Sequence, residues 1–374
     1  MQTLAVLPSK FEFLHVVLQP TSGCNINCKY CYVSERREAH KMSPDIAVAV
    51  AKSLEHCPHP VTVLWHGGEP LSSGLERFRS LCAPFHHLRR EGRIQHGLQT
   101  NVTLLTDEWC DFLQEENFRI GVSIDGPEEL NAKRVGWSGK PTFPAVMRGI
   151  ELLRERRIRF GAIAVVNPHN VSSPEEFYNF FLGLGCDSLS INVEEREGVN
   201  HHATDVPFND VQEFWKQLFA VWVARPFLKV REFDNALGWL DSVLNAPPST
   251  PKSRDLWPTV SYSGNVFVLS PELASAPLEY RERFIVGNVL AKPLHEILDE
   301  SGASWYVTQF NEGRNECKHT CGYYSYCGGG HASNKFYELG RVNGTETAHC
   351  RNSRQAVLDA VMAELSRKQA STLS

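Results

Sequence analysis

Three closely spaced cysteines constrain this chain more than any other feature of its sequence. Cys24, Cys28 and Cys31 lie within eight residues, directly after the apolar stretch 13–19, which predicts a strand. Thiolates are soft ligands that favour iron–sulfur clusters or zinc over hard cations. Three local thiols leave one iron of a four-iron cluster open to another molecule. The alternatives are a zinc knuckle, whose fourth ligand could be His40, and three cysteines that are close by chance.

The composition indicates a protein with a sizeable core and excludes some partners. The chain has 374 residues, of which 42% are hydrophobic, and a net charge of −5. This length predicts two domains. No basic block stands out, which argues against a nucleic-acid partner. No apolar run reaches the length of a membrane span and no signal-peptide layout opens the chain, so we expect a cytoplasmic protein without a membrane partner.

The number of cysteines favours metal ligation over disulfides. The chain has 11 cysteines, an odd count, and shows no export signal. Such a count argues against a disulfide framework. Four of them, Cys57, Cys82, Cys110 and Cys186, are isolated in the sequence. We expect these four to be packed as small buried hydrophobic side chains.

Strand patterns alternate with helix patterns through the first two thirds of the chain. Strands are expected over 13–19, 61–65, 94–100, 118–124, 160–166 and 188–192. Helices are expected from Ser43 onward and over 75–91, 107–117, 142–157 and 174–184. This alternation predicts an α/β fold with a parallel sheet, as a partial (β/α)6 TIM-type barrel over residues 1–235.

Residues 236–374 are expected to form a small cysteine-rich domain. No helical periodicity is apparent over 226–256, and the prolines in 247–251 indicate a linker or an exposed loop. A hairpin is expected over 262–269, with its turn at 263–265. An amphipathic helix from Arg351 onward is expected to close the chain.

Polar residues follow several of the predicted strands. Gly67, Gly68 and Glu69 follow the second strand, Asn101 the third, and Ser123 and Asp125 end the fourth. In parallel barrels, chemistry is carried out at these carboxyl ends. Glycines allow a ligand to approach the backbone, and the glutamate could accept a hydrogen bond from an ammonium group. Alternatively, Gly67–Pro70 is a simple β-turn with a surface glutamate, and Asp125 caps its loop.

These motifs together resemble the signature of the radical SAM superfamily. The resemblance rests on Cys24–Cys31, with aromatic Tyr30 before the last cysteine, and on Gly67-Gly68-Glu69-Pro70. It implies a [4Fe-4S] cluster whose open iron binds the amino and carboxylate groups of S-adenosylmethionine. It also implies that Tyr30 is a contact of that cofactor and that Gly67, Gly68 and Glu69 hold its amino group. Asn101, Ser123 and Arg134 match positions that contact its ribose or carboxylate in related enzymes.

A second set of cysteines lies near the C-terminus. Cys317, Cys321 and Cys327 are followed 23 residues later by Cys350. Four thiolates could complete a second four-iron cluster with no open iron. Four cysteines also suit tetrahedral zinc, and their spacing alone does not decide between the two.

The second set resembles the SPASM domain of radical SAM peptide-modifying enzymes. Full SPASM domains carry two auxiliary clusters, but here His331 stands where a cysteine is expected and no cysteine lies between 187 and 316. The inner auxiliary cluster is therefore expected to be missing. This partial pattern, with Cys327-Gly-Gly-Gly330 and Thr345-Glu-Thr347, looks most like the GRRM-type maturases of glycine-rich-repeat precursor peptides. Such enzymes and their close relatives join an aromatic ring carbon to a nearby β-carbon, which gives a cyclophane.

The resemblance implies two [4Fe-4S] clusters, S-adenosylmethionine and a glycine-rich precursor peptide with aromatic residues. It also implies an external electron donor such as a flavodoxin or ferredoxin. Only 23 residues precede Cys24, so leader recognition is expected on the barrel or SPASM surface or from a separate protein. Candidate bases are Asp125, Glu194, Glu195 and His331. The alternatives are thioether formation, sulfatase-type serine or cysteine oxidation, and a non-catalytic iron–sulfur or zinc scaffold.

Overall fold

The computed structural model describes residues 13–245 and 256–372. Its sheet has the strand order β10-β9-β8-β1-β2-β3-β4-β5-β6-β7. Strands β1 to β7 run parallel and span His15–Leu18, Val61–Trp65, Ile94–Thr100, Arg119–Ser123, Phe160–Val166, Ser188–Val193 and Lys229–Val230. Each strand pairs with its predecessor in the chain, which confirms the predicted partial parallel barrel.

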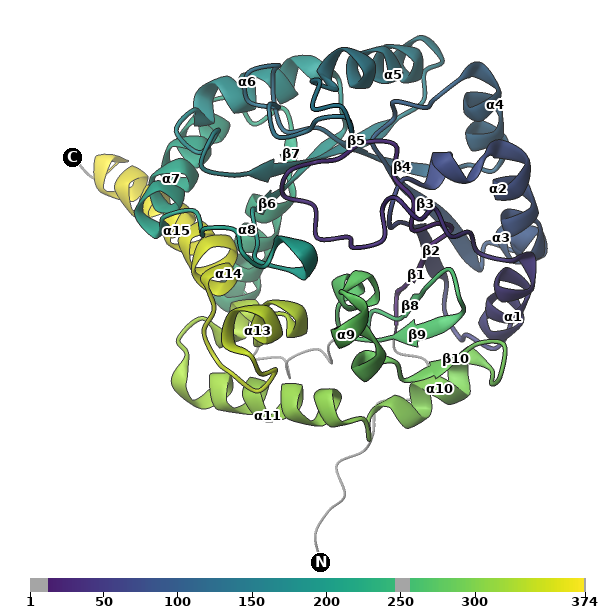
Figure 1. Cartoon of the computed structure of the whole chain (residues 1–374). Coiled ribbons are helices and arrows are strands. Elements are labelled where there is room, and N and C mark those ends of the chain that lie inside the picture. Colours follow the sequence, from purple (N-terminus) through teal and green to yellow (C-terminus); the bar gives the residue numbers. More distant parts are fainter. Residues whose placement is uncertain (1–12, 246–255, 373–374) are drawn as a thin grey trace, which may run out of the picture.

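Helices cover the outside of this curved sheet (Figure 1). They are α1 Pro44–Leu54, α2 Leu75–Cys82, α3 His86–Arg90, α4 Asp107–Glu115, α5 Phe143–Glu155, α6 Pro174–Leu184, α7 Phe208–Ala224 and α8 Arg231–Asn245. The single helix expected over 75–91 is wrong, because a 3-10 turn, Ala83–Phe85, separates α2 from α3. Pro84 lies in that turn, and proline has no N–H for a continuous helical ladder. No described helix is long and apolar enough to cross a membrane.

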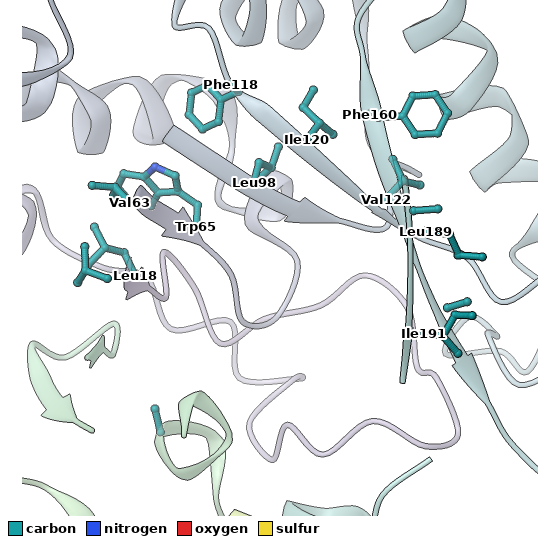
Figure 2. Packing of buried hydrophobic residues seen from close by; sticks show 14 of the residues in the cluster. Leu18, Val63, Trp65, Leu98, Phe118, Ile120, Val122, Phe160, Leu189 and Ile191 are labelled. Carbon is teal, nitrogen blue, oxygen red and sulfur yellow. The ribbon is translucent and has the colours of Figure 1, made fainter. Parts of the chain in front are cut away.

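The side chains on the two faces of the barrel sheet differ in size and polarity. Large apolar side chains such as Trp65, Phe118 and Phe160 are buried together (Figure 2). Trp65 contacts Phe78 of α2, with ring centroids 5.1 Å apart, so this face packs against the helices. Several of the alternate positions are small or polar, and Gln99, Ser123 and Asn192 among them line a cavity. The period of two along each strand therefore separates a packed outer face from a polar inner face.

The C-terminal region connects the two edges of the open barrel (Figure 1). Its elements are β8 Thr259–Val260, β9 Asn265–Phe267, the 3-10 turn η4 Pro271–Ser275, α9 Leu278–Arg281, β10 Gly287–Asn288, α10 Leu294–Ser301, α11 Trp305–Thr320, α12 Tyr324–Cys327, α13 Ala332–Leu339, α14 Ala348–Cys350 and α15 Ala356–Thr372. At one edge, β8 pairs with β1. Near the other edge, α15 packs against α7 and α8. This cysteine-rich region therefore closes the gap that the seven parallel strands leave.

Several expectations for the C-terminal region need correction. Residues 226–256 contain α8, because Phe233 and Ala236 recur at helical spacing and are buried. The predicted boundary at 235/236 falls within this helix, and the predicted linker 247–251 lies outside the described residues. The hairpin turn is confirmed, since Ser261 N–H donates to Asn265. The final helix starts at Ala356, after a π-helical turn, Arg351–Gln355.

The four isolated cysteines are packed as expected. Cys57, Cys82, Cys110 and Cys186 are all buried and belong to the apolar interior. Burial raises the pKa of each thiol, to about 11 for Cys57 and Cys110 and to about 12 for Cys186. These side chains therefore stay protonated at neutral pH and are packed as small apolar groups.

Candidate active site

A cavity of about 210 Å³ opens at the carboxyl ends of the barrel strands. Its wall includes Cys24, Cys28, Tyr30, Cys31 and Tyr32; His66, Gly67, Gly68 and Glu69; Gln99, Thr100 and Asn101; Ser123 and Arg134; and Asn192, Glu194, Glu195, Glu197 and Glu272. The three cysteines and all seven residues named from the sequence as cofactor contacts thus surround one space.

The cysteine loop is held in place by the segment that follows β4. Two backbone hydrogen bonds link the segments, from Asn27 N–H to Val135 (2.7 Å) and from Lys29 N–H to Lys133 (2.9 Å). The indole Nε1 of Trp137 donates to the Cys24 carbonyl at 2.9 Å. Because the loop has no regular structure of its own, these contacts fix the directions of its thiols.

The glycines after β2 bring the glutamate loop against the cysteine loop. Gly68 has φ +59°, and a Cβ there would lie 2.3 Å from the Gly23 carbonyl oxygen. The next residue, Glu69, donates its backbone N–H to the same oxygen at 2.8 Å. The sequence interpretation attributed the glycines to close approach of a ligand. The structure supplies a further reason, because close packing of two loops also needs a residue without a side chain.

The Glu69 carboxylate is fixed by three donors. It accepts hydrogen bonds from the Thr100 hydroxyl (2.7 Å), the Asn101 N–H (2.7 Å) and the Leu71 N–H (3.0 Å). Burial nevertheless raises its pKa above the ordinary value. A cation in the cavity would restore the charged form of this carboxylate. Glu69 is therefore suited to hold an ammonium group.

Tyr30, Asp125 and Arg134 form a buried polar group beneath the cysteine loop. Tyr30 donates its hydroxyl hydrogen to Asp125 at 2.6 Å, and Arg134 donates to the Tyr30 oxygen at 2.8 Å. Arg134 is 3.9 Å from Asp125, and its buried Nε has no hydrogen-bond partner. The guanidinium thus retains a free donor that could bind a carboxylate or a hydroxyl group.

Asn101 and Ser123 lie on the wall with their polar groups already partly engaged. The Asn101 amide donates to Asn25 at 3.0 Å and lies 3.9 Å from the Cys24 sulfur. Ser123 accepts a hydrogen bond from Gln99 at 2.7 Å, which leaves its own hydroxyl hydrogen for another acceptor. Both contacts hold these side chains in fixed orientations at the cavity.

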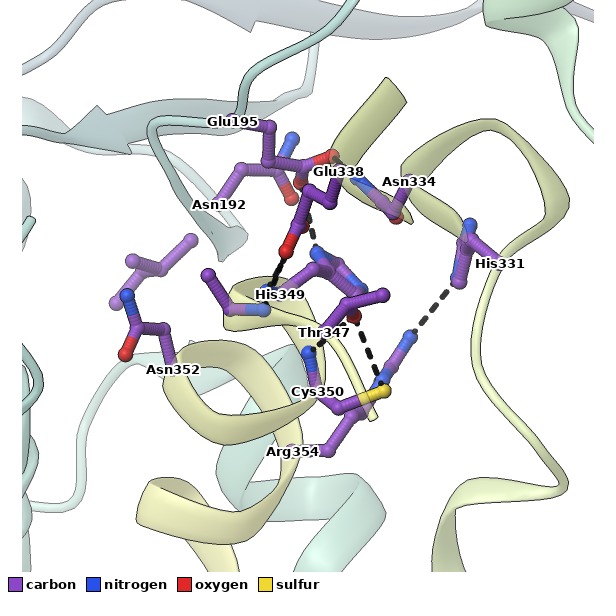
Figure 3. A network of polar contacts seen from close by, with 12 residues as sticks. Asn192, Glu195, His331, Asn334, Glu338, Thr347, His349, Cys350, Asn352 and Arg354 are labelled. Atoms are coloured by element: carbon purple, nitrogen blue, oxygen red, sulfur yellow. Dashed lines mark hydrogen bonds and ion pairs between the residues drawn. The ribbon is translucent and has the colours of Figure 1, made fainter. Parts of the chain in front are cut away.

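The four candidate bases are in different environments. Glu194 and Glu195 line the cavity, whereas Asp125 is fully buried and outside its wall. Glu194 is paired with Lys133 at 2.6 Å. Burial opposes ionisation of Glu195, but His349 at 3.1 Å and Asn334 outweigh it and lower its pKa. His331 also lies outside the cavity wall, and its ring is 4.9 Å from that of His349 (Figure 3).

Sequence reasoning missed four wall residues that carry titratable groups: Tyr32, His66, Glu197 and Glu272. Tyr32 follows the last cysteine of the loop, and its position next to Cys31 was the only available signal. Glu197 and Glu272 belong to two separate turns, neither of which carries a recognisable motif. Only the tertiary structure places these two glutamates beside the barrel residues.

The second cysteine set meets around its own cavity of about 350 Å³. Cys317 comes from α11, Cys321 caps it, Cys327 ends α12 and Cys350 ends α14. Gly328, Gly329 and Gly330 have φ values of 73°, 100° and 76°. A hydrogen bond from Cys350, together with the N–H groups of Gly329 and Gly330, lowers the pKa of Cys327 to about 5. Three left-handed residues in a row explain why this turn needs consecutive glycines.

The positions of the sulfur atoms can be compared with the geometry of a zinc site, one of the two metal sites that the sequence left open. A tetrahedral zinc site with Zn–S bonds of about 2.3 Å keeps its sulfur atoms within about 3.8 Å of one another. Among the described residues, neither cysteine set contains three sulfur atoms that all lie within 4.8 Å of one another. Neither set is therefore arranged as a compact mononuclear zinc site in this structure.

A polar network extends from Glu195, on the wall of the first cavity, to Cys350 of the second cysteine set (Figure 3). Its members come from β6 and the residues after it, from α13 and α14, and from the π-helical turn Arg351–Gln355, and Asn334 donates to Glu195 at 2.7 Å. Glu338 accepts hydrogen bonds from the backbone N–H groups of Ala348 and His349. Thr347 donates to the Cys350 sulfur at 3.2 Å. Hydrogen bonds and ion pairs thus connect Glu195, on the wall of the first cavity, to the helix that carries Cys350.

Comparison with known sequences identifies the family that the barrel region matches. The profile of the Radical SAM superfamily matches residues 18–181. An uncharacterized protein from Synechocystis is 30% identical, over 94% of this chain and 91% of its own length. The cysteine-type anaerobic sulfatase-maturating enzyme of Clostridium perfringens is 27% identical, over 85% of this chain and 88% of its own length. These relatives therefore match both the barrel and the cysteine-rich region.

Solved structures share the fold. The anaerobic sulfatase-maturating enzyme anSMEcpe, with bound AdoMet and a peptide, matches with a TM-score of 0.75 and 22% identity, over 96% of this chain and 99% of its own. Streptococcus suis SuiB, bound to its precursor peptide SuiA, matches with a TM-score of 0.68 and 14% identity, over 91% and 76% respectively. Both confirm the architecture of a partial parallel barrel with a helical cysteine-rich region.

Proposed function

The chain belongs to the radical SAM superfamily, and from that premise we propose that it oxidises side chains of a ribosomally made precursor peptide. The product that we propose is a carbon–carbon cyclophane between an aromatic ring and a nearby β-carbon. The observation that supports the proposal is that the three thiols and the polar residues of several strand ends surround one cavity. It contains an open three-thiol site, a fixed carboxylate and polar residues from five strand ends, beside a second site with four thiols.

The chain's own residues divide the binding of the cofactor among them. Cys24, Cys28 and Cys31 would hold three irons of a four-iron cluster, and Glu69 would hold the cofactor ammonium group. Arg134 would contribute its free Nε–H to the cofactor carboxylate or ribose. When bound, cluster and S-adenosylmethionine supply a 5′-deoxyadenosyl radical that removes a hydrogen atom from the substrate.

A crosslink of this type also requires removal of one proton and one electron. Of the four candidate bases, Glu194 and Glu195 keep that role in our proposal, because they alone line the cavity. Lys133 is paired with Glu194, and His349 lies 3.1 Å from Glu195 and lowers its pKa, so both carboxyl groups are held in fixed orientations. Cys317, Cys321, Cys327 and Cys350 would hold a cluster that accepts the electron or stabilises the C-terminal region. An external donor such as a flavodoxin or ferredoxin would supply the reducing electron.

The test uses the precursor peptide that we expect to be encoded beside the gene, rich in glycine and containing aromatic residues. Each ring should cost the peptide two hydrogens, persist after thiol alkylation and suppress fragmentation inside the ring. Deuterium at the substrate β-position should appear in 5′-deoxyadenosine, and deuterium at the α-position should not. Transfer from the α-position, or a product that forms only with cysteine in the peptide, would favour thioether formation instead.

Oxidation of a serine or cysteine side chain is the second candidate. It is favoured by the similarity to the sulfatase-maturating enzyme of Clostridium perfringens, which extends over 85% of this chain. Two-electron oxidation of a serine hydroxymethyl group gives an aldehyde, which a hydrazide reagent detects. A product that reacts with hydrazide and still fragments along its whole length would replace the crosslink proposal.

A further inference from the structure

Two glutamates at one end of the cavity come from turns that pack against the cysteine loop. Glu197 precedes Gly198, whose φ of +52° would place any Cβ 2.0 Å from the Tyr32 carbonyl oxygen. Glu272 lies in η4, which is joined to the same loop by a hydrogen bond from Ser34 N–H to Ser275 at 3.3 Å. Both carboxyl groups line the cavity that contains the three thiols. Their positions are therefore set by the loop that would carry the cluster.

These two carboxyl groups differ from their neighbours in having no basic side chain among the described residues paired with them. Arg134 lies beside Asp125, Lys133 is paired with Glu194, and His349 is paired with Glu195. Within the described chain, neither Glu197 nor Glu272 forms an ion pair of this kind. This end of the cavity therefore has an excess of acidic groups.

Each of the two side chains also has a buried oxygen atom without a hydrogen-bond partner. Glu197 is 4% exposed, and its Oε1 is buried and unpartnered, as is Oε2 of Glu272. Burial raises the pKa of both groups and carboxylate neighbours raise it further, so that Glu272 reaches about 7. Two buried carboxyl groups that repel each other need either protons or an added cation.

The geometry favours an organic cation over a metal ion. Apart from Glu35, Glu38 and His40, no described set of three histidine, cysteine or acidic residues places its ligand atoms within 4.8 Å of one another. Glu195, Glu197 and Glu272 therefore do not form a compact metal site. An ammonium or guanidinium group has three or five donors, and the planar guanidinium can reach two separated carboxylates.

We propose that Glu197 and Glu272 form a subsite for the side chain of a lysine or arginine in the peptide substrate. This inference rests on the proposed function, because it places a peptide in the cavity. It narrows the substrate class to peptides with a basic residue near the residue that is modified. Bound there, the cationic side chain would neutralise both carboxylates and hold the peptide against the cysteine loop.

The test measures binding without turnover, on the reconstituted enzyme with S-adenosylmethionine. The probes are n-butylguanidinium and its neutral isostere n-butylurea, followed by saturation-transfer NMR titration. The cation should bind at least about tenfold more tightly than the urea, as expected for charge-assisted hydrogen bonds in a buried site. Glu272→Gln and Glu197→Gln should each reduce this preference, and the double variant should remove it.

Glu279→Gln serves as the matched control, because Glu279 is exposed on α9 and outside the cavity wall. It should keep the wild-type preference, and iron content with thermal unfolding should show that all variants are folded. Equal binding of both probes, or a preference that survives in the double variant, would overturn the subsite. Loss of product in the variants with an unchanged preference would also overturn it and would assign a proton acceptor instead. Absence of cofactor cleavage by the wild-type enzyme would contradict the proposed function alone.

Discussion

The two cysteine sites of this protein are built in opposite ways. The first takes three thiols from one irregular loop, and it faces a cavity lined with carboxylates, amides and an arginine. The second takes four thiols from three helical elements, and Thr345, Glu346 and Arg354 are among the residues around it. Three thiols leave a metal position open, whereas four complete the set. The difference indicates that the first site is arranged for reaction and the second for electron transfer or structure.

Replacement of Cys24, Cys28 and Cys31 by alanine tests the comparison most severely. We expect complete loss of 5′-deoxyadenosine formation and a fall from about eight to about four irons per chain, because one cluster remains. Iron analysis and chromatography of the reaction provide the measurements. Cys57→Ala, at a buried cysteine of the core, is the control and should keep both. Cofactor cleavage by the triple variant would contradict the assignment of Cys24, Cys28 and Cys31 as the ligands of the cofactor-binding cluster. About twelve irons per chain in the wild type would contradict a single auxiliary cluster.

Replacement of Cys317, Cys321, Cys327 and Cys350 by alanine should separate the two sites. We expect peptide product to fall at least about a hundredfold, a loss of a few kcal/mol in transition-state stabilisation, while slow cofactor cleavage without peptide continues. The physical reason is that these thiols are outside the first cavity. Product mass spectrometry and 5′-deoxyadenosine assays measure the two effects. Equal loss of both activities would show that the sites do not act separately, and stoichiometric zinc in the wild type would favour a structural metal.

Glu69→Gln sharpens the assignment of the first site. Its carboxylate is held by three donors and is positioned for an ammonium group, so loss of the charge should weaken S-adenosylmethionine binding about ten- to a hundredfold. Equilibrium dialysis of the reconstituted enzyme gives the dissociation constant. The exposed Glu91→Gln should bind the cofactor as the wild type does. Unchanged affinity in Glu69→Gln would transfer this role to another residue.

Tyr30→Phe should have a smaller effect at the same site. It removes the 2.6 Å hydrogen bond to Asp125 and the 2.8 Å contact from Arg134 while it keeps the ring. We expect the rate of cofactor cleavage to fall about tenfold, as for the loss of a hydrogen bond to a charged group worth about 1.5 kcal/mol. The outcome that speaks against this role is a wild-type rate in the presence of saturating cofactor.

The smallest expected effect is a pH dependence of stability at Glu272. Burial raises its pKa from 4.5 to about 7, so the folded protein binds a proton that the unfolded chain releases. The contribution of Glu272 to the free energy of unfolding is therefore fully present below about pH 4.5 and is lost as the pH rises through about 7. Melting curves of the apoprotein should show a shallower pH dependence for Glu272→Gln than for the wild type. Parallel pH profiles would show that this carboxyl group is ionised in the folded chain.

Local sequence determined much of the barrel, because its strands and most of its helices are specified by short-range patterns. Strands 61–65, 94–100 and 160–166 were predicted at their observed bounds, since buried apolar residues alternate within them. We predicted no helix within 226–256, although α8 lies there and its buried residues Phe233 and Ala236 have helical spacing. The neighbouring prolines and the composition of 247–251 led to the prediction of a loop. The stability of α8 comes instead from its packing against β6 and α15, which a local pattern does not record.

The sequence by itself determined the first site and the two sets of thiols. Cysteines within one loop must lie near one another because the chain between them is short. A glutamate at the end of the next parallel strand must lie near that loop because the carboxyl ends of parallel strands share one edge of the sheet. Only the tertiary structure decided which acids face the cavity. Glu197 and Glu272 are 75 positions apart in the sequence, and both line the cavity because the turn that carries each of them is hydrogen-bonded to the cysteine loop. Asp125 is buried outside the cavity wall, where it accepts a hydrogen bond from Tyr30. Contacts between distant segments depend on the packing of the whole chain, which no local pattern records.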